Sequence, residues 1–156
     1  MDEHEINVRR PLFDRLVDTE PRVDRESRPL RTLDRAGLKE SVRRELELLF
    51  NTRSPIPVHR IPGEPRSVIN YGIPDLAVYS PQNPDHRVEL AEIIRRAAAV
   101  YEPRLVNVKV RIVPVPGRHL AVGAQIEGAV MVEGVPEQVS FEMQPGDGRM
   151  RVHVGA

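Results

Sequence analysis

The spacing of the apolar residues changes at Pro103, and this change divides the chain into two parts. In two segments before Pro103, apolar side chains recur every three or four positions, which is the period of an α-helix with one buried face. In four segments after Pro103, apolar and polar residues alternate, which is the period of a β-strand with one buried face. The pattern therefore predicts two helices followed by four strands.

The first predicted helix covers residues 38–51, and the second covers residues 85–101. The apolar stripe of the first consists of Leu38, Val42, Leu46, Leu49 and Phe50, and its charged face consists of Lys39, Glu40, Arg43, Arg44, Glu45 and Glu47. The stripe of the second consists of Val88, Ala91, Ile94, Ala98 and Tyr101, widened by Leu90, Ile93 and Ala97. We expect Asp85 to cap the second helix and Pro103 to end it.

The four alternating segments cover residues 105–112, 120–130, 139–143 and 150–154. Short turns separate them, at residues 114–118, 133–134 and 147–148. Successive strands joined in this way form an antiparallel meander, and helices can cover its apolar face. The predicted fold class is therefore α+β, with two main helices packed on a four-stranded antiparallel meander.

Residues 1–36 differ from the rest, because arginines and acidic residues alternate densely there and apolar residues are few. We predict an extended N-terminal arm over residues 1–36 and a single domain over residues 37–156. Residues 11–17 could form two helical turns, which are too short to be stable alone. We expect the arm to become ordered when it binds a partner.

The charge balance, the lack of cysteine and the lack of long apolar runs argue against several classes of protein. The chain has 156 residues, 23 basic and 23 acidic, so its charge does not favour nucleic acid or an anionic membrane as a partner. It has no cysteine, which excludes disulfides and thiolate metal sites. No apolar run approaches the roughly 20 residues of a membrane span, and the acidic N-terminus is unlike a signal peptide. We interpret the protein as cytoplasmic, without direct membrane insertion.

Catalytic patterns are missing from the sequence. The five histidines have no metal-ligand spacing, and neither a nucleophile elbow nor a phosphate-binding loop occurs. Glu102, Glu92 and Asp75 could be proposed as glycosidase carboxylates, but acidic residues are common enough that such a pair can be chosen in almost any chain. We therefore expect no catalytic residue, cofactor, metal or small-molecule substrate.

Two short segments are candidates for partner binding. The first is Glu102-Pro103-Arg104, where a carboxylate lies near the C-terminus of a helix and a proline fixes the backbone after it. This corner could present two charges to a partner, or Glu102 and Arg104 could simply pair within the domain. The second is residues 70–75, where Tyr71 and Asp75 could belong to a recognition loop or to a tight turn around Gly72.

Four stretches together resemble the TssE family of type VI secretion baseplate subunits and its relative, the lysozyme-like wedge protein of contractile phage tails. They are residues 11–16 with Glu20-Pro21, residues 41–53, residues 67–75, and Tyr101-Glu102-Pro103-Arg104-Leu105. The resemblance implies a structural wedge subunit at the cytoplasmic face of the bacterial inner membrane. Its implied partners are wedge subunits of the TssF, TssG and TssK types and contractile sheath subunits.

The resemblance also implies roles for individual residues. Glu102, Pro103 and Arg104 would engage the helical core bundle of neighbouring wedge subunits, and the family is not thought to hydrolyse peptidoglycan. We expect Glu102→Ala or Arg104→Ala to leave the isolated fold intact and abolish assembly. An exposed strand edge at residues 149–154 could add a strand from a sheath subunit. A peptidoglycan hydrolase and a regulatory adaptor on a related fold remain the alternative functions.

Overall fold

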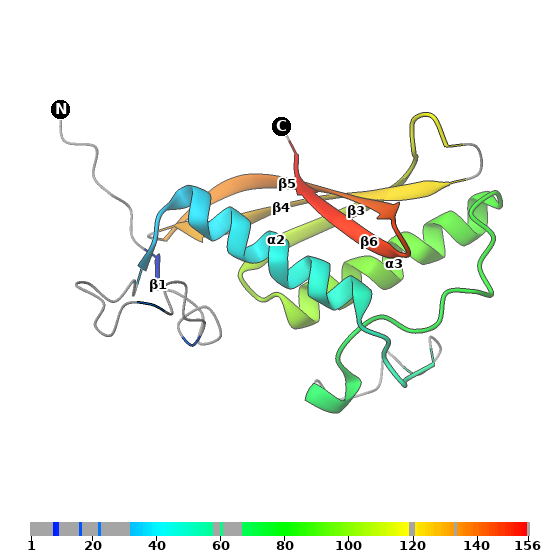
Figure 1. Ribbon diagram of the computed structural model, residues 1–156, viewed down its shortest axis with the longest axis horizontal. Helices are drawn as coiled ribbons and strands as arrows, with labels where there is room; N and C mark the ends of the chain where they lie inside the picture. Colours follow the sequence, from blue (N-terminus) through cyan, green and yellow to red (C-terminus); the bar gives the residue numbers. More distant parts are fainter. Residues whose placement is uncertain are drawn as a thin grey trace.

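A computed structural model describes residues 8–9, 16, 22, 32–57, 60, 67–118, 121–132 and 134–155 (Figure 1). The elements in chain order are β1 (Val8–Arg9), β2 (Thr32–Leu33), α2 (Arg35–Asn51), the 3₁₀ turn η2 (Val68–Asn70), α3 (Pro84–Tyr101), β3 (Leu105–Pro114), β4 (Val122–Val132), β5 (Val135–Gly146) and β6 (Arg149–Val154). The last four strands form an antiparallel sheet in the order β3-β4-β5-β6. The predicted α+β meander with two main helices is confirmed.

The N-terminal part is only partly described. Strands β1 and β2 form a separate antiparallel pair before α2. The predicted helical turns at residues 11–17 lie, except for Leu16, outside the described residues and stay a prediction. The boundary between an arm and a domain at residue 36 also stays a prediction. None of the helices in the described ranges is long and apolar enough to cross a membrane.

Both helices begin at caps that the apolar pattern did not reveal. Helix α2 begins at Arg35, because the side chain of Asp34 accepts a hydrogen bond from the Gly37 N–H at 2.7 Å. Helix α3 is capped by Asn83, whose side chain accepts from the Asp85 N–H at 2.9 Å. The prediction that Asp85 is the cap is wrong, because Pro84 occupies the first helical position and moves Asp85 into the first turn.

The core lies between the apolar face of the sheet and the two helices, which lie on the same side of it (Figure 1). Its largest fully buried side chains include Phe141, Leu38, Leu46, Leu49 and Ile126. The buried side of α3 consists of Leu90, Ile93, Ile94, Ala97 and Ala98. Val88, which we expected on the buried stripe of this helix, is exposed.

A bulge near the start of β3 decides which of its side chains face the core. The pairing with β4 changes register between Val106 and Lys109, and Asn107 has a φ of 55°. As a result Leu105 and Val108, which are three residues apart, both pack in or against the core. The start of β3, directly after the Glu102-Pro103-Arg104 corner, is therefore packed against the core by two side chains.

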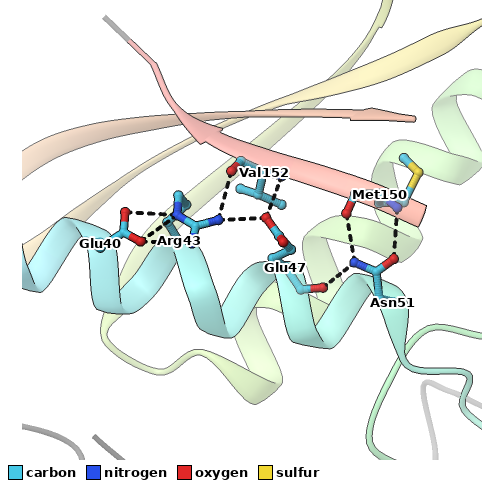
Figure 2. Close-up of polar contacts among 6 residues, drawn as sticks. All are labelled: Glu40, Arg43, Glu47, Asn51, Met150 and Val152. Atoms are coloured by element: carbon cyan, nitrogen blue, oxygen red, sulfur yellow. Dashed lines mark hydrogen bonds and ion pairs between the residues drawn. The ribbon is translucent and has the colours of Figure 1, made fainter. Parts of the chain in front are cut away.

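Part of the charged face of α2 contacts β6 instead of solvent. Arg43, Glu47 and Asn51 form hydrogen bonds with the backbone of β6 (Figure 2). The outer edge of β6 is therefore covered at Met150 and Val152. The expectation of an exposed strand edge at residues 149–154 is wrong at these two residues, because side chains of α2 already satisfy their backbone groups.

Glu47 makes this contact dependent on pH. The hydrogen bond from the Val152 N–H holds the pKa of Glu47 below its ordinary value of 4.5; burial opposes this shift, and Arg43 and Arg151 favour it. A lowered pKa in the folded state means that Glu47 stabilises the fold above pH 4.5 and that this contribution is lost as the pH falls below it.

We expect the free energy of unfolding of the wild-type protein to fall more steeply below pH 4.5 than that of Glu47→Gln, which has no carboxylate to titrate. Urea unfolding at a series of pH values measures the difference between the two proteins. Parallel pH profiles would show that Glu47 does not have a lowered pKa in the folded protein.

Candidate docking site

Glu102 and Arg104 form a buried ion pair at the junction of α3 and β3. Glu102 is the C-cap residue of α3, not part of its last turn, and its side chain is only 3% exposed. Its Oε1 accepts from Arg104 Nε at 2.7 Å, and its Oε2 accepts from Arg104 Nη2 at 2.5 Å. The backbone N–H of Arg104 also donates to Oε1, at 3.2 Å. Glu102 and Arg104 thus pair with each other within the domain, which was one of the two interpretations of this corner.

Ser41 holds the guanidinium of Arg104 from the other side. Its hydroxyl accepts from Arg104 Nη1 at 2.9 Å, and the residue is fully buried within α2. Arg104 therefore connects the end of α3 to the middle of α2. Sequence reasoning missed Ser41, although its position three residues after Leu38 places a small polar side chain on the buried face of that helix.

Tyr71 and Tyr101 bring the second candidate segment to the same end of α3. Their rings meet edge to face, with centroids 5.2 Å apart and planes at 70°. The hydroxyl of Tyr101 donates to the carbonyl oxygen of Asn70 at 2.7 Å, which fixes the loop before Tyr71. Burial raises the pKa of Tyr71 to about 12, and the nearby carboxylates of Glu45 and Glu102 add to the rise. Tyr71 is therefore a neutral phenol beside the buried ion pair.

The loop around Gly72 is held by backbone hydrogen bonds against the residues that follow α2. The N–H of Ile73 donates to the Thr52 oxygen at 2.9 Å, and the N–H of Ser54 donates to the Ile73 oxygen at 2.8 Å. Gly72 has a φ of 112°, a conformation that other residues rarely adopt. Gly72 thus has the positive φ that the tight-turn interpretation expects, and the recognition-loop interpretation stays a prediction.

Asp75 is not part of the Glu102 ion pair. Its carboxylate accepts from Arg53 Nη1 at 2.7 Å and from the Ala77 N–H at 3.0 Å. The side chains of Asp75 and Arg53 are 70% and 67% exposed, so this pair is solvated. The structure thus brings Tyr71, Glu102 and Arg104 together and places Asp75 in a separate surface pair.

The outward surface of the corner differs from its buried interior. Pro103 is exposed, and a quarter of the Arg104 side chain is exposed, whereas Glu102 is covered. A partner protein can therefore contact Pro103 and Arg104 directly. Glu102 and Ser41 are buried and would not touch such a partner; they affect binding only by fixing the orientation of Arg104.

The three acidic residues considered for glycan hydrolysis each pair with arginine. Glu102 pairs with Arg104, Asp75 pairs with Arg53, and Glu92 accepts from two arginines of its own helix. Hydrogen bonds from these arginines, Arg95 first and then Arg96, lower the pKa of Glu92 to about 2. A glycosidase acid needs the opposite shift, a raised pKa. Within the described ranges, no group of three or more His, Asp or Glu could hold a metal ion.

A family model described as "Baseplate wedge protein gp25" matches residues 36–135. The match spans both main helices, the loop around Gly72, the Glu102-Pro103-Arg104 corner, and the sheet as far as the start of β5. No curated protein and no solved structure matches the chain at a significant level. The family match confirms the resemblance to the wedge protein of contractile tails.

Proposed function

Because the chain belongs to the baseplate wedge protein gp25 family, whose role in phage-tail-like baseplates is structural, we propose that it is a wedge subunit of a bacterial type VI secretion baseplate. The observation that carries this proposal is the match over residues 36–135, which includes both candidate segments. In this role the protein acts by assembly and not by catalysis. It would work on the cytoplasmic side of the inner membrane, with wedge subunits of the TssF, TssG and TssK types and with the sheath.

Within this role, Pro103 and the exposed part of Arg104 would form the contact with the core bundle of neighbouring wedge subunits. Glu102 and Ser41 hold the guanidinium in one orientation before the partner arrives. An arginine that is already fixed loses little side-chain freedom on binding, which favours affinity. Tyr71 would border this contact, and Asp75 would form a second contact on the exposed part of the loop.

Because Glu102 is buried, alanine substitutions are a poor test of docking at this corner. Alanine at position 102 or 104 would leave the other charge of a buried pair without its partner, so either change would disturb the fold as well as docking. Arg104→Lys avoids this problem, because it keeps a positive charge beside Glu102. It removes the planar fork that a partner could recognise, since lysine is a point donor.

We expect Arg104→Lys to remain folded and to bind the other wedge subunits about 30-fold more weakly, the effect of losing one hot-spot contact. Arg111→Lys is the matched control, because Arg111 of β3 forms an exposed ion pair with Glu127 of β4. Asp75→Ala tests the proposed second contact, on the loop, in the same assay. The change should leave the protein folded, because the exposed ion pair of Asp75 adds little to stability. Titration calorimetry with purified wedge subunits measures the affinities. Equal affinities for Arg104→Lys and Arg111→Lys would exclude Arg104 as a docking residue.

A further inference from the structure

Strand β6 is an outermost strand of the four-stranded sheet, next to β5 on one side only. The other side of such a strand presents backbone N–H and C=O groups that can pair with a strand of another chain. Proteins reduce this risk by covering edge strands with other elements. Helix α2 runs along this side of β6 (Figure 2).

Asn51 pairs with Met150 in the way that a neighbouring strand would. Its Nδ2 donates to the Met150 oxygen at 2.8 Å, and its Oδ1 accepts from the Met150 N–H at 2.8 Å. The side-chain amide has the same donor and acceptor as a backbone peptide group. One side chain therefore satisfies both backbone groups of Met150.

Arg43 and Glu47 together do the same for Val152. Arg43 Nη1 donates to the Val152 oxygen at 3.1 Å, and Glu47 Oε2 accepts from the Val152 N–H at 3.1 Å. The two side chains are joined by an ion pair of 2.6 Å. Glu40 holds Arg43 further, by accepting from its Nε at 2.9 Å. These contacts fix both side chains against the strand.

One step along α2 matches one step along β6, because Glu47 contacts Val152 and Asn51 contacts Met150, whereas Arg43 contacts Val152 as well. Positions 43, 47 and 51 are four residues apart, a rise of about 6 Å per step in an α-helix. Residues of a strand that face the same way are two apart, about 6.7 Å. Since Met150 and Val152 face α2, the backbone groups of Arg151 and His153 face β5. Side chains at positions 47 and 51 can therefore cover two successive outward positions of β6, and Arg43 completes the pairing at the first of them, Val152.

We propose that Arg43, Glu47 and Asn51 form an edge latch, which covers the outer edge of β6 at Met150 and Val152 and prevents this strand from pairing with β6 of a second copy of the chain. A second copy is the relevant occupant because identical strands of equal length can pair about a two-fold axis. The latch also restricts growth of the sheet to its other outer strand, β3, unless α2 moves away from β6. This inference does not depend on the proposed baseplate role.

Amide hydrogen exchange measured by NMR tests the latch in the wild-type protein. We expect the amides of Met150 and Val152 to be protected, as are those of Arg151 and His153, which face β5. Asn51→Ala should speed exchange at Met150 about tenfold with little change at Val152, and Glu47→Ala should do the reverse. Leu48→Ala, which removes an exposed side chain from the same turn of α2, should change neither amide. Unprotected amides at Met150 and Val152 in the wild-type protein would overturn the proposal.

Sedimentation tests the guarding role with the double variant Glu47→Ala/Asn51→Ala. We expect this variant to form dimers as its concentration rises, under conditions where the wild-type protein and Leu48→Ala do not change. In these dimers the amides of Met150 and Val152 should become protected again. A double variant that associates no more than the wild-type protein, or dimers in which both amides stay exposed, would show that the latch does not guard the edge.

Discussion

Replacing Glu102 by alanine is expected to lower the free energy of unfolding by about 3 kcal/mol, near the lower end of the range for breaking a buried ion pair. The carboxylate is covered and accepts three hydrogen bonds from Arg104. Its loss removes all three of these hydrogen bonds from Arg104, while the hydrogen bond to the Ser41 hydroxyl remains. A quarter of the Arg104 side chain already reaches solvent, which keeps the cost from being larger. Equilibrium unfolding in urea measures this change.

Glu127→Ala is the control for this measurement. Glu127 also pairs with an arginine, but both side chains of that pair are more than 40% exposed, so its removal should cost less than about 1 kcal/mol. An equally small loss for Glu102→Ala would contradict the account of the corner. The hypothesis that Glu102→Ala leaves the isolated fold intact is not supported by this geometry. Loss of assembly in that variant alone would therefore not identify Glu102 as a docking residue.

Gly72→Ala is expected to destabilise the protein by about 3 kcal/mol, through backbone strain and a steric clash together. The residue has a φ of 112°, and a Cβ added there would lie 2.4 Å from the carbonyl oxygen of Thr52. To relieve this clash, the loop must move away from the end of α2. Such a movement breaks the two backbone hydrogen bonds of Ile73 and displaces Tyr71 from Tyr101.

Gly117→Ala separates the two causes. Gly117 also has a positive φ, of 73°, but a Cβ added there meets nothing within 4 Å. We expect this variant to lose only about 1 kcal/mol, the cost of the backbone conformation alone. Thermal unfolding of both variants by circular dichroism measures the difference. Equal losses would mean that contact with Thr52 does not fix the loop.

The sequence predicted the helices and the meander because their periods of 3.6 and 2 reflect a single buried face in each element. It did not predict the helix starts, since the choice between Asn83 and Asp85 as a cap depends on backbone geometry around Pro84. It also placed Arg43 and Glu47 on the solvent side of α2. Periodicity separates the apolar side of a helix from its polar side, but it cannot show which polar side chains meet a strand more than 100 residues later.

The candidate site was predictable in part. The composition of the Glu102-Pro103-Arg104 corner suggested two opposite charges in fixed directions, but it could not decide whether they meet each other or a partner. The structure shows that they meet each other, with Glu102 inside and part of Arg104 outside. The grouping of Tyr71 with this corner depends on contacts between distant segments. The assignment of all five residues to partner binding remains a prediction.

Co-purification of the wild-type chain with the other wedge subunits tests the central claim most directly. A structural wedge subunit should elute with them in one complex of defined composition after co-expression and size-exclusion chromatography. The account predicts this complex for the wild-type protein and for Arg111→Lys, and a weakened complex for Arg104→Lys. A wild-type chain that elutes alone, while the other wedge subunits assemble with one another, would contradict it.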